Sequence, residues 1–406
     1  MIVWKKYRLK DICSYIGSGT TPKSSNSKYY DNGIYNWVNT GDLNNGIVSN
    51  SKQQITDSAL KDFPTLRFYP KGTIIEAMYG ATIGKVGMLD MNATVNQACC
   101  AMIVDRNKAI PNFVLYYLLY YKPQLLKESF GGTQPNVNQF KVSNIAISIP
   151  SREEQQRIVT YLDTKLSEID HQVSLLTSKR DAYLRLKKSI INHAVTCGLN
   201  PNVKMKDSDI EWIGEVPEYW EVKRLKDIVK LMKGRTPEDL TFEEISYPYL
   251  TMDYLRNRSG KEILYPQKTA GLLKIDAGEI IVLWDGANAG EFILSKEGYL
   301  GSTMAVFLCD CKIVDKNYLY YLLKSVEKHS KYFANGTTIP HFDSLAIMNH
   351  QYALPPLHEQ RAIATYLDDK CAKIDTIVSN LDKQISRYAD LKRSLIDEVI
   401  TGKRAV

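Results

Sequence analysis

The stretch EQQRIVTYLDTKLSEID, from Glu154 to Asp170, returns 205 residues later as EQRAIATYLDDKCAKID, from Glu359 to Asp375. Chance similarity between two amphipathic helices would reproduce only the spacing of their apolar residues. It would not repeat Thr-Tyr-Leu-Asp and Ile-Asp at the same spacing. At this offset, 20 of the 47 positions from Pro150 to Thr196 are identical to their counterparts. An internal duplication is therefore the first feature of the fold, and the chain has to be interpreted as two copies of one unit.

The duplication extends upstream into the segments that precede the two stretches. Trp4, followed by Arg-Leu-Lys-Asp-Ile from residue 8, is echoed by Trp220, followed by the same five residues from 224. KGTIIEAMYGATIGKV, from Lys71, aligns with AGEIIVLWDGANAGEF, from Ala277, and GGTQPN at 131–136 aligns with NGTTIP at 335–340. Each unit is therefore expected to be a globular domain followed by a long helix.

Each repeated stretch opens a long helix with one apolar seam. Ser151 followed by Glu154 is a capping-box signature, and Pro355-Pro356 suits the entrance of the second helix. A helix of ~45 residues is a rod of ~70 Å, too long for a small globular core, so each rod is expected to pack on the other. The predicted seam consists of Leu162, Leu166, Ile169, Val173, Leu176 and Tyr183 in the first helix, and of Leu367, Ile374, Val378, Leu381, Ile385 and Tyr388 in the second.

The globular segments mix short strand-like runs with one helix each. Runs such as YNWVNT and CAMIVD are rich in β-branched and aromatic residues and are separated by Gly, Asn and Pro turns. The predicted class is α+β, with two β-rich domains separated by two long helices that form an antiparallel coiled coil with a pseudo-two-fold axis. The predicted order is a first domain at 1–150, a helix at 151–198, a linker or cap at 199–219, a second domain at 220–354 and a helix at 355–406.

Composition indicates a soluble globular protein of the cytoplasm. The chain has 406 residues, of which 44% are hydrophobic and 24% charged. Its start lacks the apolar run of a signal peptide, and FVLYYLLYY at 113–121 is far shorter than a membrane span. Seven cysteines without a Cys-x-x-Cys favour a reducing compartment. Residues 1–150 carry the whole net charge of +7, which is compatible with a polyanionic partner.

Motifs for catalysis, cofactors or metals are missing from the sequence. Gly80 to Lys85 resembles a phosphate-binding loop, but the spacing is one residue short and Val86 stands where a Mg²⁺-binding Ser or Thr belongs, so a turn between strands is predicted. Gly-x-Gly-x-x-Gly, His-Glu-x-x-His and Gly-x-Ser-x-Gly do not occur. We therefore predict no catalytic, cofactor or metal site on this chain. Its predicted role is that of a recognition protein (a reader) or a scaffold, and not that of an enzyme.

Loops at matching positions of the two domains carry polar and basic residues that differ between the copies. Asn and Gln can pair with adenine, and Arg or Lys with guanine, in the major groove, although the same residue types also make ordinary turns and caps. The candidate DNA-binding residues are Lys23, Lys28, Thr82, Lys85, Thr133, Gln134, Asn136, Asn138 and Gln139 in the first domain, and Arg235, Arg256, Arg258, Asn288, Thr337, Thr338 and His341 in the second.

These features together resemble the specificity (S) subunit of type I restriction-modification systems. The resemblance rests on the domain–helix–domain–helix order, the paired EQxxI…YLD helices, GATIGKVG, GGTQPNVNQ and DSDIEWIGEVPEYW. It implies two target recognition domains, each binding one half of a split duplex DNA sequence, and helices that dock two modification subunits. S-adenosylmethionine, Mg²⁺ and ATP would then act on partner subunits, and the adenine-methylating site would lie there too.

Two points stay open at this stage. The residues before Trp220 have no full counterpart before Trp4, and the sequence does not tell whether a restriction subunit is also a partner. The alternative function is a tandem coiled-coil adaptor that joins two protein-binding domains. The salt dependence of DNA affinity distinguishes the two alternatives, because phosphate contacts make this affinity fall steeply as the salt concentration rises.

Overall fold

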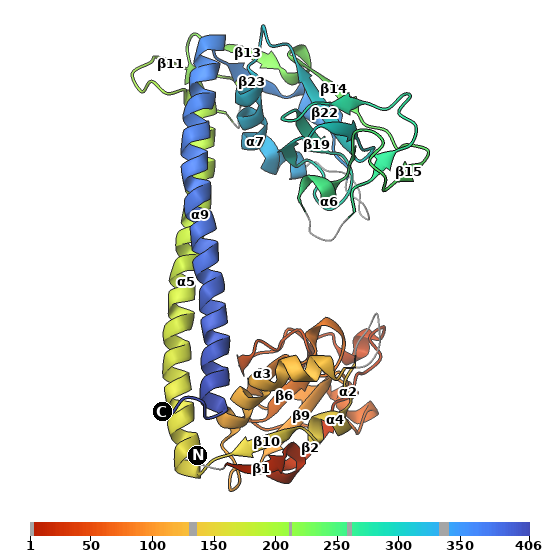
Figure 1. Cartoon of the computed structure of the whole chain (residues 1–406), viewed down its shortest axis with the longest axis vertical. Coiled ribbons are helices and arrows are strands. Elements are labelled where there is room, and N and C mark those ends of the chain that lie inside the picture. The colour runs from red at the N-terminus through yellow and green to blue at the C-terminus, as the bar shows by residue number, and fades with distance from the viewer. Residues whose placement is uncertain (1–3, 130–135, 211–212, 258–261, 333–340) are drawn as a thin grey trace. The chain divides into compact units, whose positions relative to one another are not determined.

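The computed structural model describes residues 4–129, 136–210, 213–257, 262–332 and 341–406. The chain divides into two compact units, one made of Met1–Thr177 with Lys383–Val406 and the other of Ser178–Asp382. Each unit holds one β-rich domain together with part of helix α5 (Arg152–Cys197) and part of helix α9 (Leu357–Ile400) (Figure 1). The predicted α+β class, with two β-rich domains and two long helices packed together, is confirmed.

The domain of the first unit is built on a five-stranded sheet with the order β2-β9-β6-β7-β4. Helix α3 packs over this sheet, and Phe113 and Leu118 of the helix share a buried cluster with Ile74 of β6. A three-stranded sheet, β5-β3-β8, and a pair, β1-β10, complete the domain. The elements are β1 (Lys5–Arg8), α1 (Leu9–Ile12), β2 (Cys13–Ser18), η1 (Ser27–Tyr29), β3 (Tyr35–Val38), β4 (Gly46–Val48), β5 (Gln54–Ile55), α2 (Asp57–Asp62), β6 (Ile74–Ala77), η2 (Gly80–Thr82), β7 (Val86–Leu89), β8 (Thr94–Val95), β9 (Cys99–Val104), α3 (Pro111–Lys127), α4 (Gln139–Ser143) and β10 (Ala146–Ile149).

The domain of the second unit repeats this plan on a four-stranded sheet with the order β14-β22-β19-β20. The pair β13-β23 takes the place of β1-β10, and the parallel pair β16-β21 that of β3-β8. The elements are β11 (Met205–Asp207), β12 (Glu215–Pro217), β13 (Glu221–Arg224), η3 (Leu225–Asp227), β14 (Val229–Lys233), β15 (Leu240–Thr241), β16 (Tyr249–Leu250), α6 (Met252–Leu255), β17 (Tyr265–Pro266), β18 (Lys274–Ile275), β19 (Ile280–Leu283), β20 (Phe292–Leu294), β21 (Gly298–Leu300), β22 (Met304–Cys309), α7 (Lys316–Tyr332), α8 (Ser344–Asn349) and β23 (Gln351–Leu354).

The repeated motif fastens each domain to the start of the helix that follows it. Gln155 is buried, its amide oxygen accepts from Ile110 N at 2.9 Å, and its amide nitrogen donates to Pro150 O at 3.1 Å. Gln360 repeats the arrangement with Asp315 N at 2.7 Å and Pro355 O at 2.9 Å. The two glutamines therefore join domain and helix in corresponding ways, and Gln360 also donates to Ile313 O at 3.1 Å.

In each unit a tyrosine of the helix within the domain, α3 or α7, makes a second repeated hydrogen bond to the motif. Tyr116 of α3 donates its hydroxyl hydrogen bond to Asp163. Tyr321 of α7 donates to Asp368 at 2.7 Å. Because the acceptors are the aspartates of the two Thr-Tyr-Leu-Asp sequences, the domain helix and the long helix are joined in the same way in both units.

Helices α5 and α9 run antiparallel in both units. In the first unit Lys392 Nζ lies 2.7 Å from Asp170, and in the second Lys187 Nζ lies 2.6 Å from Asp375. The two ion pairs are repeat counterparts of each other. Their carboxylates are about 60% exposed, so each pair contributes only about 0.5 kcal/mol and acts mainly on register.

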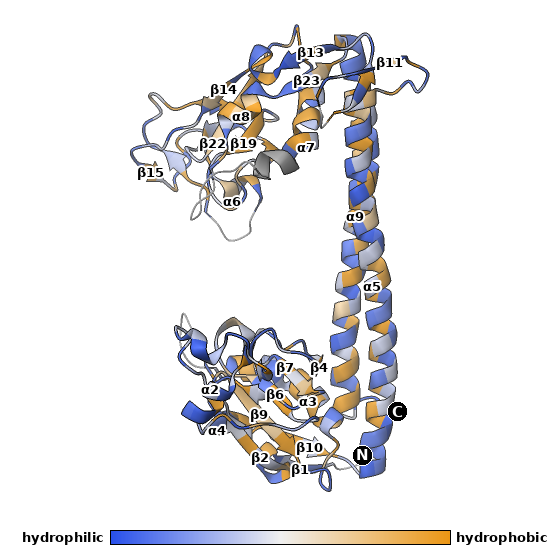
Figure 2. Cartoon of the chain, turned by 180° about the vertical axis from the view of Figure 1, so that it is seen from behind, coloured by the Kyte–Doolittle hydropathy of each residue, from blue (hydrophilic) through white to orange (hydrophobic). Residues whose placement is uncertain are grey.

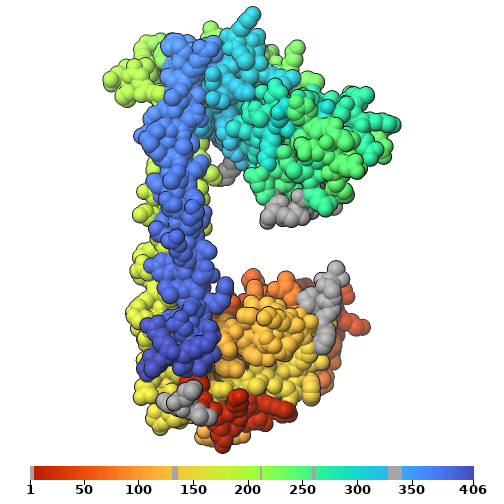
Figure 3. Space-filling model, in the orientation of Figure 1, coloured from red at the N-terminus to blue at the C-terminus, as the bar shows by residue number. Residues whose placement is uncertain are grey.

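Half of the predicted seam positions are buried and the other half are half-buried. Leu162, Leu166 and Ile169 join Leu395, Ile396, Val399 and Ile400 in the core of the first unit. The space-filling view shows the dark-blue end of α9 against the orange surface of α3 (Figure 3). In the second unit Leu367, Ile374 and Leu381 are buried. The other seam positions are half-buried, because a pair of helices covers only one side of each; they are Val173, Leu176, Tyr183, Val378, Ile385 and Tyr388.

Tryptophan packs at the end of each long helix. Glycines follow α5 and α9 with φ values of +74° at Gly198 and +72° at Gly402. A Cβ on Gly198 would lie 3.3 Å from the ring of Trp220, and one on Gly402 would lie 3.1 Å from Trp4. In the first unit the residues after α9 therefore lie beside the first tryptophan, where the sequence offered no upstream cap.

Replacing either buried glutamine with leucine is expected to lower the free energy of unfolding by about 2 kcal/mol. Gln155→Leu leaves one backbone N–H and one carbonyl without their partner, and Gln360→Leu leaves one backbone N–H and two carbonyls without theirs. Urea unfolding followed by circular dichroism measures the change. Gln156→Leu is the matched control, because the Gln156 side chain is exposed and, among the described residues, bonds only to Thr160 of its own helix. Equal stability of the Gln155 and Gln156 variants would contradict the assignment.

Candidate nucleic-acid interface

In the first domain the turn after β6 meets the segment before α4. Tyr79 forms an antiparallel bridge with Asn136, and Val137 N donates to Met78 O at 2.9 Å. The turn contains η2, which confirms the prediction of a turn between strands in place of a phosphate-binding loop. Three predicted residues, Thr82, Lys85 and Asn136, are thereby brought to one end of the sheet.

The second domain builds the same junction from different side chains. Asp285 forms a bridge with His341, and Phe342 N donates to Trp284 O at 2.8 Å. His341 Nδ1 lies 2.6 Å from Asp285 Oδ1. Asn288 is exposed on the turn. The two domains thus present unlike groups from one shared backbone arrangement.

Several candidate side chains of the first domain also hold its local structure. Asn138 accepts from Lys141 N at 2.9 Å and caps α4. Gln139 Nε2 donates to Ile16 O at 3.0 Å, and Thr82 Oγ1 donates to Tyr79 O at 2.9 Å. Lys28 pairs with Asp62 at 3.1 Å. In the part of the chain that the structure describes, Lys23 and Lys85 form no ion pair, so their charges are available to a partner.

The candidate basic residues of the second domain are more strongly engaged. Arg256 Nη2 lies 2.6 Å from Glu291 Oε2, and Glu291 stands where the first domain has Lys85. Arg235 Nη1 donates to Gly271 O at 3.4 Å. Five candidates lie outside the described residues: Thr133, Gln134, Arg258, Thr337 and Thr338.

A buried carboxyl group lies beneath this junction in the first domain, where sequence reasoning did not place it. Glu76 of β6 is 1% exposed, and within the described residues neither of its carboxylate oxygens has a hydrogen-bond partner. Burial raises its pKa from 4.5 to about 8, against the opposing attraction of Lys122. Burial and the neighbouring Lys85 lower the pKa of Lys122. The signal in the sequence is that the repeat counterpart of Glu76 is apolar, Val282.

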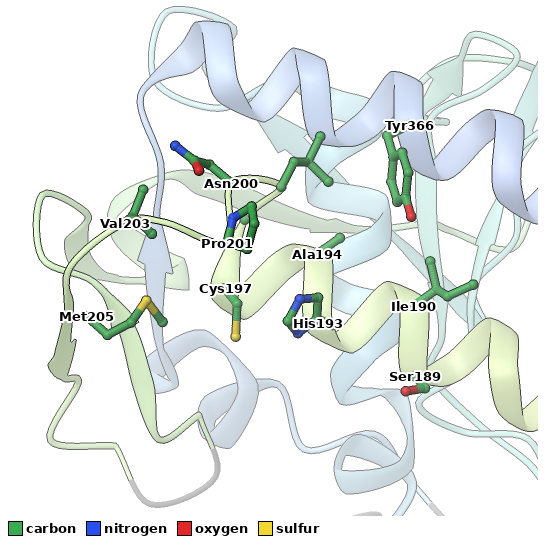
Figure 4. Close-up of a pocket in the computed structure, with 12 residues that line it drawn as sticks. Ser189, Ile190, His193, Ala194, Cys197, Asn200, Pro201, Val203, Met205 and Tyr366 are labelled. Atoms are coloured by element: carbon green, nitrogen blue, oxygen red, sulfur yellow. The ribbon is translucent and has the colours of Figure 1, made fainter.

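One pocket of the second unit, of about 790 Å³, lies between the end of α5, the following segment and Tyr366 (Figure 4). His193 and Cys197 line it, but neither side chain is hydrogen-bonded to the other in the described contacts. Among the residues that the structure describes, no three His, Cys, Asp or Glu side chains gather as metal ligands. The seven cysteines are free.

Both long helices carry exposed leucines at counterpart positions. Along α5 and α9 hydrophobic residues alternate with hydrophilic ones (Figure 2). Leu186 and Leu391 are repeat counterparts, and their side chains are 48% and 51% exposed. Within the described residues no helix is both long and apolar enough to cross a membrane.

Known proteins resemble this chain in sequence, one of them over nearly its full length. The sequence model for the type I restriction modification DNA specificity domain matches residues 1–175 and 217–387. The type I restriction enzyme MjaIX specificity subunit of Methanocaldococcus jannaschii is 28% identical over 99% of this chain and 94% of its own length. The MjaVIII specificity subunit of the same organism is 38% identical over 46% of this chain and 43% of its own.

A solved structure supports the fold independently of close sequence similarity. A chain of the type I R-M system, solved in a study of complex assembly and conformational transition, superposes with a TM-score of 0.72. The two chains are 17% identical, and the match covers 98% of each. The repeated domains, the paired helices and the family match lead to one conclusion: this chain belongs to the family of DNA specificity subunits of type I restriction-modification systems.

Proposed function

We propose that this specificity subunit recognises an asymmetric duplex DNA sequence in two halves, one bound by each domain. The observation that carries the proposal is the pair of junctions described above. Their backbones correspond, with Tyr79 opposite Asn136 and Asp285 opposite His341. Their exposed side chains differ, and Lys85 is replaced by Glu291. Base edges in the major groove are distinguished by such changes of donor, acceptor and charge.

We also propose that the chain docks two methyltransferase subunits, one for each unit. A duplicated surface suits two copies of the same partner, because each copy then meets the same contacts. The counterpart ion pairs of α5 with α9 and the counterpart leucines Leu186 and Leu391 support this arrangement. A restriction subunit is a further candidate partner. The specificity subunit is the non-catalytic part of the complex, and the cofactors reside on the modification and restriction subunits.

The proposal is tested by expressing the chain with its methyltransferase and mapping methylated adenines across a genome. We expect one split sequence to be methylated. Exchanging residues 1–150 for the first domain of a relative with another target should then change one half of that sequence and leave the other half intact. The reason is that each domain has its own core and its own loops. Changes in both halves would contradict the independence of the two domains, and a continuous target would contradict recognition in two halves.

A further inference from the structure

The most exposed large hydrophobic side chains of the described chain are two repeat counterparts. Phe140 of α4 is 73% exposed and Leu345 of α8 is 76% exposed. The two residues are 205 positions apart, which is the offset of the repeat. The two domains have otherwise diverged, yet both expose an apolar side chain at this position. This indicates a shared role.

Both side chains stand on short helices whose inner faces are firmly buried. Val142 on α4 is 0% exposed and its counterpart Ile347 on α8 is 3% exposed. Each helix is capped by a side chain, since Asn138 accepts from Lys141 N at 2.9 Å and Asp343 accepts from Ala346 N at 2.9 Å. The outward direction of the apolar residue is therefore set by the packing of the opposite face.

The backbone of each apolar residue is anchored in the same way. Asn144 donates its side-chain amide to Phe140 O at 2.8 Å, and its amide oxygen accepts from Arg8 at 3.0 Å. In the second domain Asn349 donates to Leu345 O at 2.9 Å and accepts from Lys226 at 2.7 Å. A rigidly held exposed hydrophobic group loses little conformational entropy on binding.

The residues around Phe140 favour DNA, and not a protein, as the partner that this side chain contacts. Asn136, Asn138 and Gln139, which precede Phe140, are polar and exposed, whereas a protein-binding surface needs a contiguous apolar core. The same segment forms the junction at Tyr79 where the candidate base-reading residues gather. Single apolar residues, Phe and Leu among them, are the groups that DNA-binding proteins insert between base steps.

We propose that Phe140 and Leu345 are wedge residues, each of which enters a base step of its own half-site and partly unstacks it. The inference rests on the proposed recognition of a split DNA target. It also assigns a step to the specificity subunit, because a methyltransferase must take its target base out of the stack and a loosened step lowers the cost of doing so.

The test uses the complex with its methyltransferase and duplexes of the mapped target that carry 2-aminopurine beside the modified adenine of one half-site. We expect Phe140→Ala to reduce the fluorescence gain on binding in the first domain's half-site and to lower kcat/KM there by about tenfold. Leu345→Ala should do the same in the other half-site only. The exchanged variants Phe140→Leu and Leu345→Phe should retain the signal, because both side chains can act as wedges.

Ile34→Ala and Phe242→Ala are the matched controls, since these side chains are 65% and 64% exposed and are expected to leave the signal unchanged. Wild-type fluorescence gain in Phe140→Ala and Leu345→Ala would overturn the wedge while leaving split-site recognition intact. Loss of complex assembly without DNA in these variants would overturn it in favour of a protein contact. If the wild-type complex methylates no defined sequence, the proposed function is wrong, and the proposal of wedge residues, which depends on it, is wrong as well.

Discussion

Replacing Glu76 with glutamine is expected to stabilise the first domain, by an amount that grows from pH 4.5 to pH 8 and reaches about 5 kcal/mol. Glu76 is fully buried on β6, and within the described residues its carboxylate oxygens lack hydrogen-bond partners. Burial raises its pKa to about 8. The folded protein therefore holds this group in its neutral form, whereas the unfolded chain releases the proton at its ordinary pKa.

The sign of the pH dependence follows from proton binding. Below pH 4.5 the carboxyl is protonated in both states, so it does not affect the difference between them. Between pH 4.5 and about 8 the unfolded state loses its proton and the folded state keeps it, so the wild-type domain loses stability as pH rises. Above pH 8 the cost stays constant. Glutamine is neutral throughout and removes this loss.

The groups around Glu76 decide how complete the effect is. Lys122 on α3 attracts the charged form and opposes the rise in its pKa. Cys100 lies opposite Glu76 on β9, and burial raises the pKa of its thiol, so it supplies no charge. Tyr121 of α3 is also close, and its pKa is raised to about 12. Lys122 is therefore the neighbour whose replacement, as Lys122→Met, should increase the pH dependence further.

Hydrogen exchange of the β6 amides as a function of pH measures the stability of this domain in the intact chain. Glu76→Val copies the second domain and should behave like Glu76→Gln at high pH, with added stability from apolar packing. Glu153→Gln is the control, because Glu153 is exposed at the start of α5. A constant difference between Glu76→Gln and the wild type across this pH range would show that Glu76 is charged in the folded state.

The duplication made much of this fold predictable from sequence. The repeat predicted two β-rich domains and two packed helices, because apolar spacing and the paired Thr-Tyr-Leu-Asp sequences are local features. The reason for the motif was not predictable. Gln155 and Asp163 act through Ile110 and Tyr116, which are more than 40 residues away in the chain, so their role appears only after folding.

The candidate interface was less predictable than the fold. Sequence reasoning chose polar residues by type and included Asn138 and Gln139, whose side chains bond within the domain. It passed over Phe140, because an apolar residue in a short helix is usually buried. Exposure depends on which face of α4 packs inward, and a helix of five residues carries too little periodicity for the sequence to decide that face.

Inserting two alanines in α5 after Leu176 is expected to abolish methylation by the complex, a loss of more than about a hundredfold. Each residue of an α-helix turns the chain by about 100°, so two added residues rotate one part of α5 by ~200° against the other. Register is fixed separately in each unit, by Lys392 with Asp170 and by Lys187 with Asp375. A continuous α9 cannot satisfy both pairs after such a rotation.

Matched four-residue insertions, one after Leu176 in α5 and one after Asp382 in α9, should keep the complex active. Four residues nearly complete a turn and add ~6 Å to each helix, so both ion pairs can form as before. DNA rises ~3.4 Å per base pair, and the unread gap in the methylated sequence should therefore grow by one or two base pairs while both half-sites stay the same. Mapping methylated adenines across a genome measures both the loss of methylation and the length of the unread gap. An active matched variant with an unchanged gap would show that the length of the helices does not set the spacing of the half-sites.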